Sequence, residues 1–271
     1  MKKIIALLLV IVMTALLLAS CGDKLTPVEQ YHEAVKKSNE LETRALHTQM
    51  KETITMKGKS TQVMDSTVTE PDQTIVLEMT SDSYYESETK FRMDSHISYD
   101  TFAQDTKVYR DGAWIYVETD GKGAKIPADS ELADSLGNFG LVEDVAFDET
   151  IENVTVEKNK NGKTFSFTLT ENEFSDLFGE MIDTAFATAV DDTVKVLSSK
   201  IGGIQYEMTT NKKGYMTKSE MSFVLNMTIE AEGETEEMSL VMEVVSEFLN
   251  PGKPVTAEPI PGYEKFEEVP V

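Results

Sequence analysis

The chain has 271 residues, 48 of them acidic and 25 basic, which gives a formal net charge of −23 at pH 7. Such a surface repels nucleic acid and anionic lipid headgroups, so the composition excludes a nucleic-acid-binding protein and a protein that docks on membranes through a basic patch. The single cysteine excludes a fold held by internal disulfides, so burial of apolar side chains must stabilise it. A hydrophobic fraction of 40% is sufficient for a core.

The first 20 residues have the pattern of a signal peptide. Lys2 and Lys3 supply positive charge, and the run from Ile4 to Leu18 is almost entirely apolar. At about 15 residues it is shorter than the roughly 20 that a helix needs to cross a bilayer, which favours a cleaved signal over a retained span. Leu18-Ala19-Ser20-Cys21 has the form of a bacterial lipobox. The segment therefore predicts lipidation of Cys21.

A processed lipobox cysteine places the protein at the cell membrane, lipid-anchored on the extracytoplasmic face. Cys21 would become the first residue of the mature chain and carry a diacylglyceryl group, with a further acyl chain such as palmitate. Two or three acyl chains anchor a protein stably, whereas one binds reversibly. Residues 21–25 form only a short lipidated tether. We therefore expect any ligand exchange to occur close to the membrane.

The residues after this tether predict a helix from Thr26 to about Leu41. Thr26-Pro27-Val28-Glu29 has the form of a capping box, with proline at the first helical position. The side chains expected on the buried side of this helix are Val28, Tyr31, His32, Val35 and Leu41.

Alternation of apolar and polar residues predicts strands over most of the remaining chain. In the first, the even positions Leu46, Thr48, Met50, Glu52, Ile54 and Met56 form one mainly apolar face. Gly58 ends this strand. Further strands at hairpin spacing are expected over Thr61–Thr69, Gln73–Ser81, Lys90–Tyr99, Thr106–Arg110, Ala113–Glu118, Ile151–Lys158, Lys163–Thr170, Ile204–Thr210, Tyr215–Glu230 and Glu236–Phe248.

Three other stretches interrupt or end the strands. Residues 120–148 are rich in Gly, Asp and Ser, which predicts a connector with one or two short helices. A second capping box at Thr170-Glu171-Asn172-Glu173 opens an amphipathic helix whose apolar side runs from Phe174 to Ala189. The proline-rich tail, residues 250–271, is expected to run extended over the surface or to be disordered.

This order of elements predicts an α+β fold with one domain over residues 26–249. About eleven strands in hairpin order, with two or three helices inserted between groups of them, are typical of an antiparallel sheet whose helices gather on one face.

The sequence offers little support for an enzyme. It contains no nucleophile elbow, no zinc-protease helix motif and no phosphate-binding glycine loop, so no catalytic residue and no cofactor is predicted. His32 lies on the first helix, while His47 and His96 fall on polar strand faces, positions typical of surface residues. The glutamates at 230, 232, 234, 236 and 237 could together bind a calcium ion, which is the more specific interpretation of this segment. The segment lacks the spacing of calcium-binding loops, however, and this favours a solvated turn.

The methionines are more informative about function than the histidines and glutamates, because several of them fall on the apolar faces of long strands. Met50, Met93, Met221 and Met227 are examples. Methionine is flexible and polarisable, so a face rich in it can adapt to ligands of varied shape, such as acyl chains. The alternative is an ordinary core filled with methionine beneath the helices, and the pattern alone does not separate the two.

Taken together, the lipobox, the early helix and strand over Tyr31 to Met56, the strand-turn-strand unit Val108–Val117, the inserted helix and the closing long hairpin are similar to the LolA/LppX-like superfamily. The resemblance spans most of residues 26–249, and the uncharacterised lipoprotein branch is the most similar part. It implies a half-barrel, a curved antiparallel sheet of about eleven strands with helices covering its concave face. It also implies that a lipid or a lipidated protein is carried between sheet and helices.

The leading hypothesis is a membrane-anchored, non-enzymatic lipoprotein that binds a lipid or acyl chain between sheet and helices. The rival is an acidic interaction module with a filled core that docks an envelope protein. Under the first hypothesis the ligand-binding side chains are Met50, Ile54, Phe91, Met93, Phe165, Phe167, Phe174, Phe178, Met181, Met221, Phe223, Leu225 and Met227. The helix from Phe174 to Ala189 would cover them and lift to admit ligand.

Overall fold

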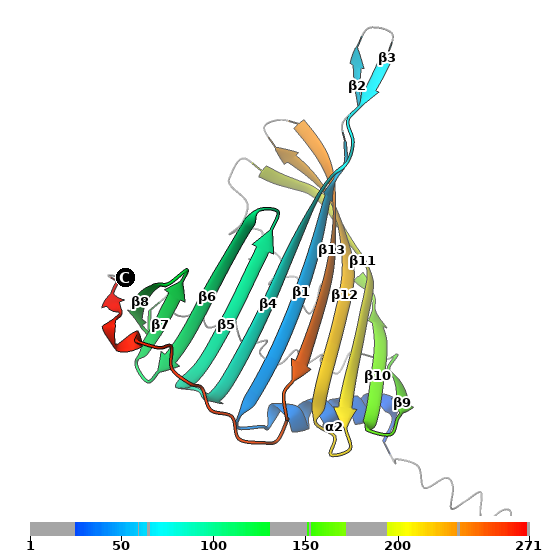
Figure 1. The fold of residues 1–271 in the computed structure, drawn as a ribbon. Helices are drawn as coiled ribbons and strands as arrows, with labels where there is room; N and C mark the ends of the chain where they lie inside the picture. The colour runs from blue at the N-terminus through cyan, green and yellow to red at the C-terminus, as the bar shows by residue number, and fades with distance from the viewer. Residues whose placement is uncertain are drawn as a thin grey trace, which may run out of the picture.

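The protein is built on one open, curved sheet of 12 strands (Figure 1). The computed structural model describes residues 25–58, 60–63, 66–130, 151, 153–171, 194–231 and 234–269. Across the sheet the strands follow the order β14-β8-β7-β6-β5-β4-β1-β13-β12-β11-β10-β9. Neighbouring strands are antiparallel, except that β14 runs parallel to β8. Most neighbouring strands are thus consecutive in the chain. The pairing of β1 with β13 joins the half of the sheet that contains β4–β8 to the half that contains β9–β12.

The strands are long in the middle of the sheet and short at its edges. In chain order they are β1 (Arg44–Met56), β4 (Gln73–Ser87), β5 (Lys90–Tyr99), β6 (Phe102–Asp111), β7 (Trp114–Thr119), β8 (Lys122–Pro127), β9 (Thr155–Lys158), β10 (Gly162–Leu169), β11 (Val194–Asn211), β12 (Met216–Ala231), β13 (Glu234–Phe248) and β14 (Glu267–Glu268). The predicted curved antiparallel sheet is confirmed, with one strand more than expected.

Three predictions about strands are wrong. The strand expected over Ile204–Thr210 is β11, which begins ten residues earlier at Val194 and continues through Gly202 and Gly203. The single strand expected over Thr61–Thr69 is a separate hairpin of β2 (Ser60–Val63) and β3 (Ser66–Thr69). Six of the eight residues in these two strands are polar, so their sequence lacks the continuous apolar face that fixes the pairing of a strand with the main sheet. The segment after Asp120, predicted to be a connector, contains β8. Glycine has a low strand propensity, so the glycines of this segment did not indicate a strand. Gly123 is required there because a Cβ atom would lie 2.3 Å from the ring of Phe266.

Helix α2 (Pro27–Asn39) begins as the sequence predicts. The Thr26 side chain accepts a hydrogen bond from the Glu29 backbone N–H at 3.3 Å, and Glu29 Oε2 accepts one from the Thr26 backbone N–H at 2.6 Å. The helix buries Tyr31, Val35 and three further residues, whereas His32 and Leu41 are only half-buried. Within the described residues α2 is the one α-helix, fewer than predicted. The expected helix from Phe174 lies outside the described residues, as does most of the connector in which one or two short helices are expected.

Replacing Thr26 with alanine should weaken the start of α2. The loss of its capping oxygen is expected to lower the free energy of unfolding by about 1 kcal/mol. Urea denaturation of the full chain measures this, and Thr26→Ser, which keeps the oxygen, serves as the control. Equal unfolding midpoints for the alanine variant and the wild type would contradict the capping role.

The C-terminal tail is anchored on the side of the sheet opposite α2. Ala257 and Ile260 are 0% exposed and pack against Tyr109. Arg92 Nη1 donates hydrogen bonds to the carbonyl oxygens of Glu258 and Pro259, at 3.0 and 3.2 Å. Of the two courses expected for the tail, the structure shows the extended one, ending in the 3₁₀ turn Tyr263–Lys265 and β14.

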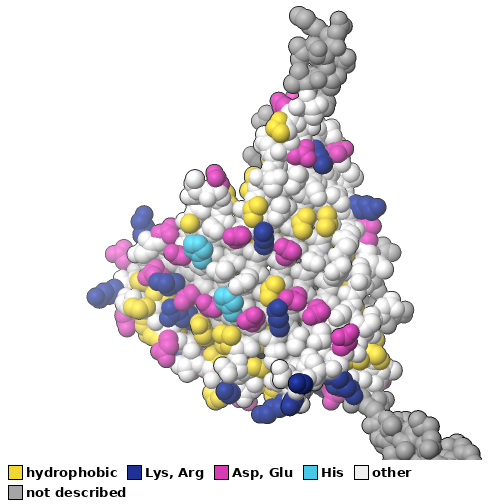
Figure 2. Space-filling view, turned by 45° about the vertical axis from the view of Figure 1, so that its right-hand side comes forward, with side chains coloured by type: hydrophobic (Ala, Val, Ile, Leu, Met, Phe, Trp, Pro, Cys, Tyr) yellow, Lys and Arg dark blue, Asp and Glu magenta, His cyan; other side chains and the backbone are white. Residues whose placement is uncertain are grey.

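The sheet therefore has two chemically different sides. We call the side that contacts α2 the helix-side face and the other the tail-side face. The tail-side face carries short-range ion pairs, including Arg92–Asp94 at 2.8 Å and Lys107–Glu118 at 2.6 Å. Charged side chains of both signs, mixed with apolar ones, cover the side of the molecule shown in Figure 2. In the described part of the chain, no helix combines the length and apolar character needed to span a membrane.

Candidate ligand-binding face

The predicted ligand-binding residues on the central strands share the helix-side face. Directly opposed residues of an antiparallel pair project to the same side. Met50 lies opposite Val244, and Val244 lies opposite Met221. Ile54 is connected in the same way through Leu240 to Leu225. Phe223 and Met227 lie on β12 two residues either side of Leu225, so they point to the same face.

The predicted residues on the outer strands join the same face. Tyr206 of β11 lies opposite both Phe167 and Met221, so β10 presents Phe165 and Phe167 to this side. On the other half of the sheet, Met93 lies opposite Ser83, and Ser83 lies opposite Leu46 of β1. Phe91 is two residues from Met93 and points the same way. The three predicted helical members, Phe174, Phe178 and Met181, lie outside the described residues.

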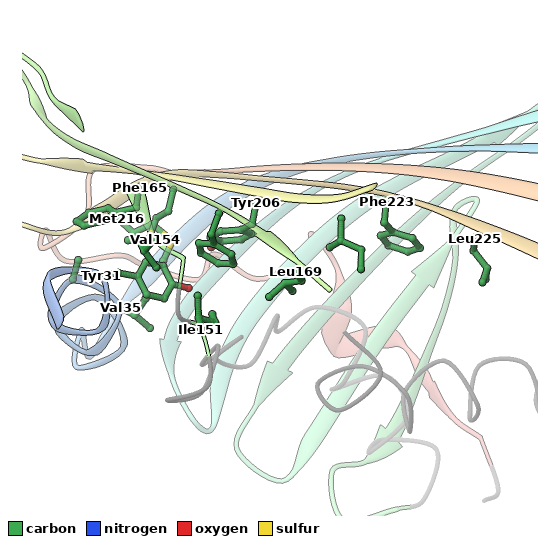
Figure 3. Close-up of a cluster of buried hydrophobic side chains, with 14 of the residues drawn as sticks. Tyr31, Val35, Ile151, Val154, Phe165, Leu169, Tyr206, Met216, Phe223 and Leu225 are labelled. Carbon is green, nitrogen blue, oxygen red and sulfur yellow. The ribbon is translucent and has the colours of Figure 1, made fainter. Parts of the chain in front are cut away.

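Beneath α2 this face is a filled core. Tyr31 is 0% exposed, and its ring meets those of Phe165 and Phe167 edge-on, with centroids 6.0 and 5.3 Å apart (Figure 3). Tyr206 makes a third edge-on contact with Tyr31 at 6.4 Å. Burial raises the pKa of Tyr206 to about 12, so this hydroxyl stays neutral. Here the structure supports the filled core that the sequence left as an alternative.

A second buried cluster lies on the other half of the helix-side face. Phe91 and Met93 of β5 pack with Val108, Ile115 and Ile126 of the next three strands. Arg110 is at the edge of this cluster, opposite both Phe91 and Ile115. Most of the predicted residues that the structure describes therefore divide between two cores, while Met50 and Ile54 are only half-buried, so they do not line a single uniform pocket.

The part of the helix-side face between the two cores is apolar but only half-buried. We call it the central strip: Met50, Glu52 and Ile54 of β1, Leu77 and Met79 of β4, and Met242 of β13. Met50 lies opposite Met79, and Met242 lies opposite Glu52, so the strip is continuous across three strands. Three of its six side chains are methionines, which adapt to the shape of a bound molecule.

Glu52 is the exception to the apolar character of the central strip. It lies opposite Leu77 on one side and Met242 on the other. Burial raises the pKa of Glu52 above its ordinary value of 4.5, because the ionised carboxylate loses solvation beside these apolar side chains. The sequence pattern placed Glu52 on this face but gave it no role.

Replacing Glu52 with glutamine is expected to raise the melting temperature at pH 7. Since the pKa of Glu52 is higher in the folded than in the unfolded chain, its contribution to stability is present below the unfolded pKa and is lost as pH rises through the folded pKa. The gain from glutamine should therefore disappear as pH falls well below the unfolded pKa, where Glu52 is neutral in both states. A gain that grows on acidification would contradict this assignment.

A row of side chains leads from the central strip to an exposed aromatic pair. Leu77 lies opposite Tyr99, and Tyr99 lies opposite Phe102 across the β5–β6 hairpin. The two rings are tilted by 30° to each other with centroids 4.9 Å apart, and the two residues are 43% and 42% exposed. The helix-side face thus changes from buried core at Phe223 to open apolar surface at Phe102.

His47 and His96 lie where the sequence places them, away from this face, whereas His32 lies on α2 beside Tyr31. His47 Nδ1 is 2.8 Å from Asp82 Oδ1, and His96 Nδ1 is 2.8 Å from Asp105 Oδ1, both on the tail-side face. Among the described residues, no group of three or more His, Cys, Asp or Glu side chains is placed to hold a metal ion. Glu232 of the proposed calcium turn lies outside the described residues.

A groove of about 640 Å³ with both polar and apolar lining opens on the tail-side face of β9–β13. Three glutamates line it: Glu207, Glu220 and Glu243. Glu207 and Glu220 lie opposite each other on β11 and β12. Sequence reasoning missed this groove, because its walls come from five strands whose pairing the sequence does not reveal.

Comparison with known proteins gives a family but no activity. No curated protein matches the chain. One similar solved structure is the ywiB protein from Bacillus subtilis, with 9% identity, a TM-score of 0.19 and coverage of 78% of this chain and 96% of that one. Another is an acyl-CoA hydrolase from Agrobacterium tumefaciens, with 11% identity, a TM-score of 0.13 and coverage of 74% and 79%. Residues 26–253 match the family of unknown function DUF6612, and the chain belongs to that family.

Proposed function

We propose that this protein binds a lipid or another molecule with an acyl chain on the central strip and holds it without catalysis. The observation that carries the proposal is a continuous apolar strip, rich in methionine and only half-buried, lying between two filled cores. An acyl chain leaves water at a gain of about 0.8 kcal/mol per buried CH₂, so binding needs no catalytic group. Lipidation of Cys21 would keep this binding at the membrane surface.

The proposed architecture is the half-barrel of the LolA/LppX-like superfamily. The open, curved sheet and the packing of α2 on one of its faces support it. In that arrangement the helix-side face is the concave one, and the ligand would lie against it. Anchoring at Cys21 favours a protein that hands lipid over locally rather than one that diffuses between membranes.

The test is photolabelling of the full chain in lipid nanodiscs. The probe is a twelve-carbon alcohol with a diazirine in its chain, and empty nanodiscs give the background. Met50→Asp places an unpaired charge in the central strip and should lower the specific labelling about tenfold. Gln49→Asp, one residue away on the tail-side face, should leave it unchanged. Labelling at background level, or equal in both variants, would contradict lipid binding at this strip.

A second candidate function is docking of a protein partner. The groove lined by Glu207, Glu220 and Glu243 favours it, because a basic segment would be attracted to these carboxylates, of which Glu220 is already paired with Lys218. Binding of a lysine-rich peptide to the full chain, weakened by 0.5 M salt and by Glu243→Gln, would support docking. Binding unaffected by either would oppose it.

A further inference from the structure

Glu52 is an isolated carboxylate in an apolar row that crosses the sheet. In that row Met242 lies between Phe223 and Glu52, while Leu77 lies between Glu52 and Tyr99. Each is directly opposite its neighbour, so all of them project from the helix-side face. Any molecule lying across this part of the face would contact the carboxylate.

Within the part of the chain that the structure describes, no protein group neutralises this carboxylate. Glu52 makes no hydrogen bond and no ion pair with a described residue. Lys51, the adjacent basic residue of β1, points to the tail-side face, opposite Glu78 and Glu243. Among the described groups, none competes with a ligand for the half-buried charge of Glu52.

A carboxylate in this position selects among ligands by charge. An ionised Glu52 would form a charge-assisted hydrogen bond with a protonated amine, and low local polarity strengthens such a bond. The same charge would repel the carboxylate of a fatty acid. The net charge of −23 acts in the same direction, attracting cations and repelling anions over longer distances.

The surroundings of Glu52 also fix where the hydrocarbon of such a ligand would lie. Towards β12 the row ends in Phe223, which is buried in the core, so that direction is closed. Towards β6 it leads over Leu77 to the exposed pair Tyr99 and Phe102, two to three strand spacings away, or roughly 10–15 Å. This length suits a medium or long alkyl chain.

We propose that Glu52 binds the protonated amine of a cationic amphiphile whose alkyl chain lies over Leu77 towards Tyr99 and Phe102. The inference rests on the proposed function, since it takes the central strip as the binding surface. It adds the chemical class of the ligand: an amine-bearing amphiphile binds better than a neutral one, and a fatty acid binds worst.

The experiment compares three photoreactive probes on the full chain in nanodiscs of zwitterionic lipid at pH 7. They share one twelve-carbon diazirine chain and end in an amine, an alcohol or a carboxylate. With the wild type, specific labelling by the amine is expected to exceed that by the alcohol about tenfold, as a charged hydrogen bond predicts. Glu52→Gln should abolish this preference and leave the alcohol signal in place. Glu78→Gln, the same change on the tail-side face of β4, should preserve it.

The outcomes separate the two proposals. No specific labelling by any probe contradicts the proposed function and this inference together. Specific labelling by the alcohol, with no preference for the amine or with a preference that survives Glu52→Gln, contradicts the role of Glu52 alone. A preference lost in both Glu52→Gln and Glu78→Gln reflects the overall charge of the protein and also contradicts it.

Discussion

Replacing Tyr31 with alanine is expected to lower the free energy of unfolding by about 3–5 kcal/mol, the cost of removing a large aromatic side chain from a core. The Tyr31 ring is 0% exposed and is the contact between α2 and the aromatic rings of β10 and β11. Its loss would leave a cavity between the helix and the sheet. Urea denaturation followed by circular dichroism measures the change.

The control for this substitution lies on the same helix. Glu33 is exposed, so Glu33→Ala should change the free energy of unfolding by no more than about 0.5 kcal/mol. A Tyr31→Ala variant as stable as the Glu33→Ala variant would show that α2 does not pack on the sheet as described.

Replacing Ile260 with alanine is expected to cost about 2–5 kcal/mol, a large effect for a residue in a proline-rich tail. Ile260 is 0% exposed and packs with Ala257 on Tyr109. The cavity would loosen the tail, so cleavage by a protease after Lys253 or Lys265 should become faster than in the wild type. The urea midpoint and the rate of limited proteolysis measure the two effects.

Val269→Ala is the matched control in the tail. Val269 is 42% exposed, and its substitution should leave both the stability and the cleavage rate near the wild-type values. If Ile260→Ala behaved in the same way, the tail would not be anchored on the tail-side face.

Strand alternation predicted the central sheet well. The strand at Lys90–Tyr99 has the predicted ends, and β1 extends only two residues beyond the predicted start at Leu46. In both strands one face is mainly apolar and the other mainly polar, which produces a period of two in the sequence. The capping box at Thr26 was equally clear, because its signal is local.

Elements stabilised by distant contacts were harder to predict. β8 contains Gly123, whose lack of a side chain makes room for Phe266 far along the chain. Ala257 and Ile260 lie among prolines without any periodic pattern, and their burial depends on the aromatic side chains of the tail-side face. Neither contact can be inferred from residues adjacent in sequence.

Only part of the candidate site could be predicted, because the rest depends on contacts between residues that are distant in sequence. Alternation places Met50, Ile54 and the β12 residues on one face, because strand faces follow from sequence parity. It does not show that Phe165 and Phe167 are covered by Tyr31 while Met50 remains half-buried, since that depends on where α2 packs. Glu52 was visible in the pattern as a polar exception, but its isolation became clear only once Leu77 and Met242 were placed beside it.

The central claim is that the helix-side face, at the central strip, holds a hydrophobic ligand. Its most direct test is to map the covalent adducts of the twelve-carbon alcohol probe by peptide mass spectrometry of the full chain. We predict adducts on the peptides containing Met50–Ile54 of β1 and Leu77–Met79 of β4, suppressed by excess unlabelled alcohol. Adducts confined to the tail-side groove residues, or adducts on β1 and β4 that excess alcohol fails to suppress, would contradict it.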